Sequence, residues 1–441
     1  DPEELSRINP FDWKVEFPEA MGAGGFDCII GNPPYGAFFD DGEKAYIRTL
    51  YKSYKYKYDS YIYFIEKALL LAAPKGYVSF ITPELWLKLE NCAPLRKFIS
   101  TQAGFISLRL NGENVFADAV VNTIIFLLCR SEKIDELLIE SGGEHWKLSS
   151  SAWMSADNFT IDYRVKSSTT ALVKKIKLNA EPLSTFGEAI QGITPYDKYR
   201  GQDQQLIKNR GFHSNHKKDN TYGKWLSGKD LSRYSLEWSG EWLSYGPWLA
   251  AQRDQRFFMG PRLLFREIPG KHRRIQSTIV EKEIFYHGHS ITPFKQFSAN
   301  EIDLFYLLGL VNSKLLSWYG GLTLPNFGKT VFPKLNPQDI NSIPIYVVDF
   351  ASPINKYRHD RIIELVRQML DLCKPRASSK GTGEQEHLQR QIDYTDKQID
   401  ALVYELYGLT QDEIEIVEAS FNEKSTTSSP FSATIETFSI Q

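Results

Sequence analysis

The chain has 441 residues, of which 42% are hydrophobic, 24% charged and 13% aromatic, and its net charge is −2. These proportions are those of a folded globular protein, so they exclude long disorder, collagen and a coiled-coil rod as descriptions of the whole chain. The charge is unevenly distributed: residues 191–300 hold 18 lysines and arginines against 10 acidic residues, and residues 381–441 hold 3 against 12. The basic block indicates a polyanion partner, with an ordinary solvated surface as the alternative.

The first third of the chain alternates strand and helix patterns. Short apolar runs predict strands, and apolar residues at helical spacing predict helices. The expected strands cover 26–30, 77–82, 105–110 and 120–129, and the expected helices cover 58–73 and 84–100. This order is typical of an α/β fold with a doubly wound sheet. The last run is rich in β-branched residues, which favours a central strand.

After residue 130 the alternation stops, and the chain is expected to continue as three further parts. Residues 1–135 form the sheet-containing part, and residues 136–181, with their Ser and Gly clusters, are expected to be a linker region. Short strands, turns and many aromatic residues over 182–350 predict an α+β domain. Residues 351–441 are expected to form a helical tail, with helices over 360–373 and 386–406.

The cysteines and the longest apolar stretch indicate where the protein works. The four cysteines, Cys28, Cys92, Cys129 and Cys373, are widely spaced and form no C-x-x-C pair, which favours a reduced, cytoplasmic setting. The apolar stretch over 119–129 is far shorter than the roughly 20 residues of a membrane-spanning helix, so we expect no membrane partner. Short-spaced histidines occur without nearby cysteines, so no metal site is expected.

The sequence Asn32-Pro33-Pro34-Tyr35, directly after the first strand, is the sharpest chemical motif. An exocyclic amine of a nucleobase is a poor nucleophile because its lone pair is delocalised into the ring. The Asn32 side-chain oxygen and the Pro33 carbonyl are suited to accept its two hydrogens and free that lone pair. The prolines stiffen the loop and remove N–H donors, and Tyr35 offers a ring face to an extruded base. The motif therefore indicates amino-group methylation, with a plain turn as the alternative.

The residues around this motif resemble a known family. FDCIIGNPPYG resembles the catalytic motif of γ-type N6-adenine DNA methyltransferases, and YDSYIYFIEKALLLAAPKGYVSFITPELWL resembles the helix and strand that follow it. GENVFADAVVNTIIFLL resembles a later motif of these enzymes, which implies that Phe116 packs against the flipped adenine. NSKLLSWYGGLTLPNFGKTVFPKLNPQDINSIPI is similar to the TaqI-like C-terminal specificity domain and to type I specificity subunits.

The resemblance covers about residues 11–417 and implies a full set of functional expectations. The fold would be the back half of a doubly wound methyltransferase sheet, followed by a target-recognition domain and a helical tail. The protein would transfer a methyl group from S-adenosylmethionine to adenine N6 in double-stranded DNA, within a restriction–modification or phage-defence system. The resemblance further implies that the cofactor contacts Asp12, Trp13, Pro34 and Phe64.

One feature of the family is expected to lie outside this chain. Its members hold the cofactor with a glycine-containing loop upstream of the catalytic motif, and only 31 residues precede Asn32 here. We therefore expect that the amino-terminal part of the catalytic domain is missing and that this chain is inactive alone. The missing region or a restriction subunit is then an expected partner.

The basic aromatic block is expected to contact DNA. Arg262 and Arg266 flank a predicted strand, and the block also contains Arg273 and Arg274; all four are candidate DNA-binding residues. A non-catalytic DNA-binding specificity module that acts with a partner is the main alternative function. Protein and RNA methyltransferases also carry the motif, but they would not need so large a recognition block.

Overall fold

The computed structural model describes residues 11–36, 39–55, 59–112, 115, 121–298, 302–329, 333–374 and 382–422. These residues divide into two compact units, one within residues 1–169 and the other within residues 170–429. No helix in these ranges has the length and apolarity needed to span a bilayer.

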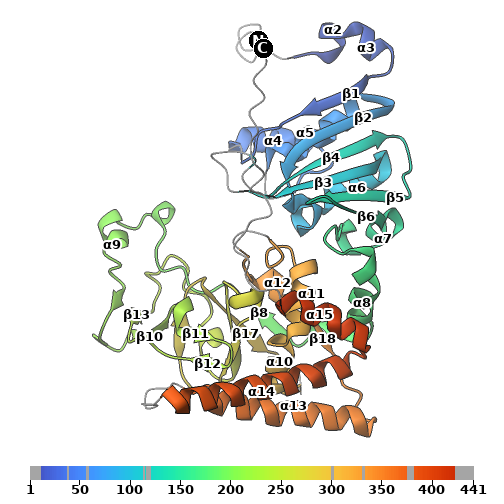
Figure 1. Ribbon diagram of the computed structural model, residues 1–441. Helices are drawn as coiled ribbons and strands as arrows, with labels where there is room; N and C mark the ends of the chain where they lie inside the picture. Colours follow the sequence, from blue (N-terminus) through green and yellow to red (C-terminus); the bar gives the residue numbers. More distant parts are fainter. Residues whose placement is uncertain are drawn as a thin grey trace, which may run out of the picture. The chain divides into compact units, whose positions relative to one another are not determined.

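The first unit is built on a six-stranded mixed sheet in the order β1-β2-β4-β3-β5-β6 (Figure 1). The strands are β1 (Phe26–Gly31), β2 (Ala72–Pro83), β3 (Ala103–Gly112), β4 (Thr123–Arg130), β5 (Glu136–Ser141) and β6 (Glu144–Ser149). β1 and β2 are parallel, β4 is antiparallel to both β2 and β3, β3 and β5 are parallel, and β6 is antiparallel to β5. The carboxyl ends of β1 and β2 therefore meet at one edge of the sheet.

Helices pack on this sheet through one continuous apolar core. The helices of the unit are α2 (Trp13–Glu16), α3 (Pro18–Gly22), α4 (Asp41–Leu50), α5 (Ser60–Leu71), α6 (Ala93–Gln102) and α7 (Ser150–Met154). Alternate residues of β2 and β4, such as Val78 and Phe126, are buried in the core with residues of α5 and α6 such as Ile65 and Leu95. Ile30 and Tyr77 are exposed by 79% and 46%.

The predicted α/β fold is confirmed, and the structure adds two points to it. β4 is central as expected, but it runs antiparallel to its neighbours β2 and β3. The pattern of buried residues in a strand shows which side chains face the core, but it does not show in which direction the strand runs. Residues 136–149, expected to lie in a linker region, form β5 and β6 and extend the sheet. Leu137 and Ile139 are buried in the core of the first unit, because this edge hairpin buries one face.

The second unit contains two four-stranded sheets and two short strand pairs. Their orders are β16-β10-β13-β9, β15-β14-β17-β8, β11-β12 and β18-β7. The strands are β7 (Ala180–Pro182), β8 (Gly187–Ala189), β9 (His213–Ser214), β10 (Tyr222–Leu226), β11 (Leu231–Ser232), β12 (Ser235–Leu236), β13 (Trp242–Ser244), β14 (Arg262–Arg266), β15 (Ser277–Val280), β16 (Phe285–His287), β17 (Ile291–Gln296) and β18 (Pro344–Tyr346).

The second unit has eight α-helices in the described residues, one of which is fully buried and contacts two of the others. The eight are α8 (Ser167–Leu178), α9 (Gln204–Lys208), α10 (Leu304–Val311), α11 (Lys314–Thr323), α12 (Pro337–Asn341), α13 (Pro353–Leu372), α14 (Thr382–Leu406) and α15 (Gln411–Asn422). Every residue of α10 is buried, which its sequence LFYLLGLV explains because it is apolar on all sides. α13 packs on α10 and on α14, so the expected tail helices belong to this unit (Figure 1).

Candidate active site

The loop Asn32–Tyr35 begins where β1 ends, at the shared carboxyl edge of β1 and β2. Gly31 pairs with Phe80, so the loop leaves the sheet three residues before β2 ends at Pro83. Pro33 is buried, whereas Asn32 and Pro34 are exposed. The buried proline anchors the loop while its neighbours face solvent at the edge where open α/β sheets bind ligands.

The hydrogen-bond acceptors of this loop are not equivalent. The Ser60 hydroxyl at the start of α5 donates to the Pro34 carbonyl at 2.5 Å. In the parts of the chain that the structure describes, neither the Asn32 side-chain amide nor the Pro33 carbonyl has a hydrogen-bond partner. The loop therefore has two acceptors without a partner among the described residues, on adjacent Asn32 and Pro33. The third acceptor, the Pro34 carbonyl, is already hydrogen-bonded to Ser60.

Tyr35 is held at both ends of its side chain. Its hydroxyl donates to the Ile81 carbonyl of β2 at 2.9 Å, and the edge of the ring packs against buried Tyr61, with 6.1 Å between centroids and 86° between planes. Partial burial raises the pKa of Tyr35, so the phenol stays neutral at physiological pH. The ring is thus fixed at the end of β2, in the same loop as the two open acceptors.

A buried polar cluster continues the same edge beyond β2. Glu84 follows Pro83 and accepts hydrogen bonds from Asn122 at 2.9 Å and from Arg164 at 2.6 Å. Lys88 lies 3.3 Å from Asp162, and burial lowers its pKa to about 8. This cluster was not predicted, because its members are distant in sequence: Glu84 and Asn122 lie in two separate motif-like segments, and Asp162 and Arg164 lie in neither.

The residues expected to stack on the base and to hold the cofactor have different outcomes. Phe116 lies outside the described residues. Asp12 is exposed and caps α2 by accepting from the Lys14 amide at 2.9 Å, and Phe64 is 47% exposed on α5. The exposed carboxylate of Asp12 and the partly exposed ring of Phe64 are accessible to a nucleoside.

Trp13 fits a cofactor contact less well. Its ring packs against three aromatic rings, those of Phe11, Phe17 and Phe26, with centroids 4.8 to 5.9 Å away. Within the described ranges, no hydrogen bond or ring contact joins Asp12 or Trp13 to Pro34 or Phe64. These cofactor contacts stay predictions.

Arg262, expected to contact DNA, is instead an interior residue. Its side chain is fully buried at the start of β14 and donates to the carbonyls of Gly260 at 2.8 Å and Glu283 at 3.1 Å. Burial lowers its pKa to about 10. A phosphate contact by Arg262 is not compatible with this position, because β14 is buried on both of its faces there: Arg262 and the next three residues are all 0% exposed.

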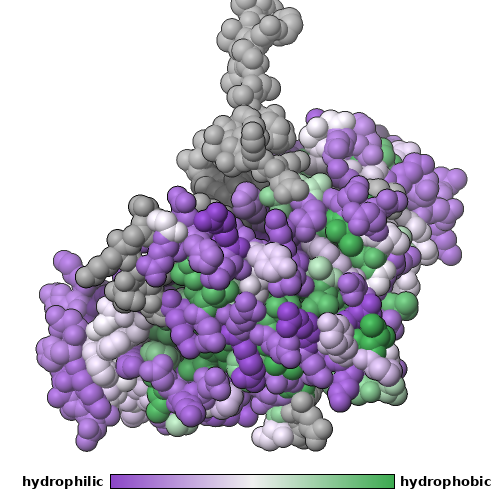
Figure 2. Space-filling model, turned by 60° about the horizontal axis from the view of Figure 1, so that its bottom comes forward, coloured by the Kyte–Doolittle hydropathy of each residue, from purple (hydrophilic) through white to green (hydrophobic). Residues whose placement is uncertain are grey.

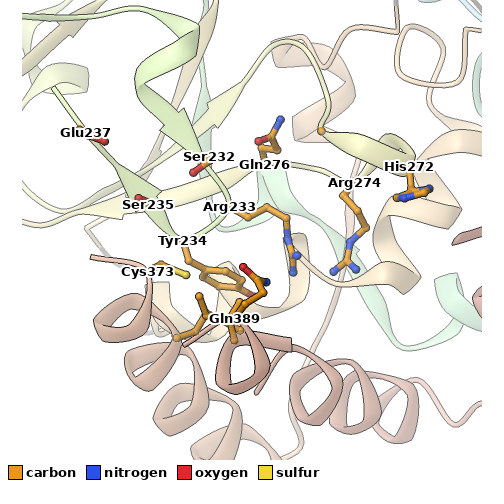
Figure 3. A pocket seen from close by; sticks show the side chains of 13 residues that line it. Ser232, Arg233, Tyr234, Ser235, Glu237, His272, Arg274, Gln276, Cys373 and Gln389 are labelled. Carbon is orange, nitrogen blue, oxygen red and sulfur yellow. The ribbon is translucent and has the colours of Figure 1, made fainter. Parts of the chain in front are cut away.

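Arg274 is also committed to the interior. It donates to the Asn312 carbonyl at 2.6 Å, and with Arg233 it pairs with Asp396 of α14. The side chains of Arg233 and Arg274 extend in the same direction along a cavity of about 620 Å³ (Figure 3). The sequence shows that Arg274 is charged, but it does not show that Asp396 forms an ion pair with it. Of the other candidates, Arg266 is half-buried and Arg273 is exposed, and their DNA contacts stay predictions.

Two segments of the chain match known protein families. Residues 1–116 match the Eco57I restriction-modification methylase family, and residues 223–345 match the TaqI-like C-terminal specificity domain. The chain thus contains one segment similar to a restriction–modification methylase family and one segment similar to a specificity domain. The methylase match includes the Asn32–Tyr35 loop, and the specificity-domain match includes β14 and Arg274.

Individual relatives agree with this assignment. A putative type II restriction enzyme and methyltransferase of Methanocaldococcus jannaschii is 25% identical over 379 residues, covering 80% of this chain and 30% of that protein. The type II methyltransferase M.HincII of Haemophilus influenzae is 22% identical over 426 residues, which is 82% of each protein. RM.Eco57I of Escherichia coli is 30% identical over 29% of this chain and 12% of its own length. The methylase–specificity chain thus spans less than a third of the first and third of these proteins.

A solved structure shares the fold. The type IIL restriction-modification enzyme MmeI, determined in complex with DNA, aligns with a TM-score of 0.53 and 14% identity. The alignment covers 93% of this chain and 58% of MmeI, so both units have counterparts in one known architecture.

Proposed function

We propose that the protein methylates adenine N6 in double-stranded DNA. The observation that carries this proposal is the pair of open acceptors on Asn32 and Pro33 beside the immobilised ring of Tyr35. Two open acceptors on adjacent residues, followed by an aromatic ring, suit a base that carries an exocyclic amine. The match of residues 223–345 to a specificity domain supports DNA as the partner.

The residues of the loop have different roles in the proposed reaction. The Asn32 side-chain oxygen and the Pro33 carbonyl accept the two hydrogens of the amine and localise its lone pair on nitrogen. Tyr35 holds the extruded base by stacking. S-adenosylmethionine, when bound, supplies an electrophilic methyl group. Positive charge then develops on the amine, so the two acceptors bind the transition state more strongly than the ground state, and the proton leaves to solvent.

The test measures both the product and the dependence on Asn32. The protein, as expressed from its gene, is incubated with duplex DNA and labelled S-adenosylmethionine, and the DNA is digested and analysed by mass spectrometry. N6-methyladenine is expected. Asn32→Ala is expected to lower kcat by about 10²-fold or more and to change the Kd for duplex DNA by less than about twofold.

Two results would contradict the proposal. Methylated cytosine, RNA or protein in place of N6-methyladenine would assign the amine-binding loop to another substrate. A normal kcat for Asn32→Ala would show that the open acceptors do not take part in the reaction.

A further inference from the structure

The interior positions of Arg262 and Arg274 raise the question of where the second unit meets DNA. Other charged side chains near β14 are paired: Arg256 forms ion pairs with Glu188 at 2.9 Å and Asp254 at 3.2 Å, and Lys224 pairs with Glu283 at 3.0 Å. The DNA-contacting surface must therefore be sought among cations that have no carboxylate partner. This argument rests on the proposed function.

Two neighbouring loops, residues 194–202 and 245–253, are tied into one rigid surface. Thr194 and Ala251 form a β-bridge, with backbone hydrogen bonds of 2.9 and 2.8 Å. The Gln202 amide donates to the Pro195 carbonyl at 3.1 Å and to the Trp248 carbonyl at 3.0 Å, and accepts from the Asp197 amide at 2.8 Å. One glutamine thus closes the first loop and fastens it to the second.

Tyr199 projects from the first of these loops into solvent. Its side chain is 85% exposed, the highest value among the large hydrophobic residues of the described ranges. The backbone beneath it is fixed, because the Asp197 carboxylate accepts from the Tyr199 amide at 2.8 Å. The nearby Tyr196 faces inward and stacks on Phe212. An exposed ring on a fixed backbone loses little conformational entropy when it stacks on a ligand.

Cations without carboxylate partners accompany this ring. Lys198 lies 4.8 Å from the Tyr199 ring centroid, Arg200 follows directly, and the Arg253 side chain donates to the Gly192 carbonyl at 3.3 Å. All three are exposed and, among the described residues, form no ion pair. Trp248, on the second loop, is 41% exposed. The lobe that carries α9 is mostly hydrophilic (left of Figure 2), which fits a charged ligand better than an apolar protein face.

We propose that Lys198, Tyr199, Arg200, Trp248 and Arg253 form the surface by which the second unit contacts DNA. In this surface, here called the Tyr199 surface, the aromatic rings stack on bases or wedge against a base step, and the cations hold phosphates. Aromatic side chains interleaved with unpaired cations are the combination that nucleic-acid grooves use. The Tyr199 surface takes the place of the interior arginines that the sequence pattern favoured.

The experiment measures binding of the 441-residue chain to a fluorescein-labelled duplex by anisotropy at several salt concentrations. Tyr199→Ala is expected to weaken binding about tenfold, and Tyr199→Phe is expected to bind like the wild type. Arg200→Ala and Arg253→Ala are each expected to make the log–log salt slope shallower by about 0.9. Because these side chains are exposed, the variants should keep the wild-type melting temperature.

Matched controls come from α14, which lies in the acidic region. Tyr394 is 65% exposed and Arg390 is exposed and, in the described residues, unpaired, so Tyr394→Ala and Arg390→Ala are expected to bind like the wild type. Absence of duplex binding by the wild-type chain would contradict the proposed function as well as this surface. Wild-type binding with unchanged affinity and salt slope in the Tyr199-surface variants would overturn the surface alone, as would an equal loss in the α14 controls.

Discussion

Ser60 holds the Asn32–Tyr35 loop through one hydrogen bond, from its hydroxyl to the Pro34 carbonyl at 2.5 Å. Ser60→Ala removes this bond without adding volume at a buried position. We expect kcat for methylation to fall about tenfold, because the two open acceptors lose their fixed orientation, while the Kd for DNA changes little. Steady-state kinetics of the full-length protein checks this, with Ser100→Ala on the exposed side of α6 as the control. An unchanged kcat would show that buried Pro33 and the Tyr35–Ile81 hydrogen bond are enough to hold the loop.

Two substitutions of Tyr35 distinguish the contribution of its ring from that of its hydroxyl. Tyr35→Phe keeps the ring and its packing on Tyr61 but loses the hydrogen bond to the Ile81 carbonyl, so we expect a decrease in kcat of less than about tenfold. Tyr35→Ala loses the stacking face as well and is expected to reduce kcat by about 10²-fold or more. Parallel measurements with duplex DNA distinguish the two variants. Equal losses would mean that the hydroxyl, and not the ring, is the functional group.

His287 makes the stability of the second unit depend on pH. It is fully buried, its ring nitrogens have no partner within the described ranges, and burial lowers its pKa to about 3. Since the unfolded chain binds the proton with a pKa near 6.5, the folded state binds fewer protons between these values. The free energy of unfolding therefore falls as pH falls below about 6.5.

The pH effect is isolated by comparing two proteins. From pH 7.5 to pH 5, wild type is expected to lose about 2 kcal/mol more than His287→Gln. The comparison is needed because burial raises the pKa of Asp339 to about 7, which changes stability in the opposite direction. Urea titrations followed by tryptophan fluorescence provide the values, and His387→Gln on the exposed face of α14 is the control. Parallel pH curves for wild type and His287→Gln would refute this prediction.

Among the elements, α6 depends on one buried arginine. Arg96 is fully buried and donates to the carbonyls of Trp86, Leu89, Asn158 and Phe159, and burial lowers its pKa to about 10. Arg96→Met leaves these carbonyls without their donor and is expected to destabilise the first unit by about 3 kcal/mol or more. Lys97→Met on the exposed face of α6 should change stability by less than about 1 kcal/mol. Chemical unfolding compares the two, and equal effects would contradict this role for Arg96.

The elements that were predicted from the sequence are those with strong local patterns. The apolar run of β1 and the helical spacing of α5 are both local, and the structure confirms them. β5 and β6 were not foreseen, because an edge hairpin with one exposed face mixes polar and apolar residues and resembles a linker. The direction of β4 depends on which neighbours it meets, and that information lies outside the strand itself.

The same distinction applies to the candidate site. The chemistry of Asn32–Tyr35 is contained in four adjacent residues, so the motif alone suggests it. Ser60 lies 26 residues further along the chain and looks like an ordinary residue at a helix start. Arg262 and Arg274 have the charge of DNA-binding residues. Only the tertiary structure shows that Arg262 donates to backbone carbonyls and that Arg274 pairs with a carboxylate.

At the scale of the whole molecule, each unit has a core of its own. The first unit has the cluster that contains Trp86 and Phe126, and the second encloses α10 completely. We expect residues 170–422 to fold alone and to unfold in one cooperative transition. Circular dichroism and thermal melting of this segment check the expectation. A segment ending at residue 374 lacks α14 and α15 and should melt at a clearly lower temperature; equal melting temperatures would contradict a structural role for those helices.

The place of β4 in the sheet has a consequence for synthesis on the ribosome. β4 is made after β2 and β3, yet it lies between them and pairs with both. Until Thr123–Arg130 has emerged, the nascent chain holds two apolar strands whose shared neighbour does not yet exist. Direct pairing of β2 with β3 at that stage would have to be undone before β4 could enter. Completion of the central sheet is therefore delayed until the β3–β4 pair has formed, and we expect a chain arrested before residue 123 to be prone to aggregation because β2 and β3 lack their shared neighbour.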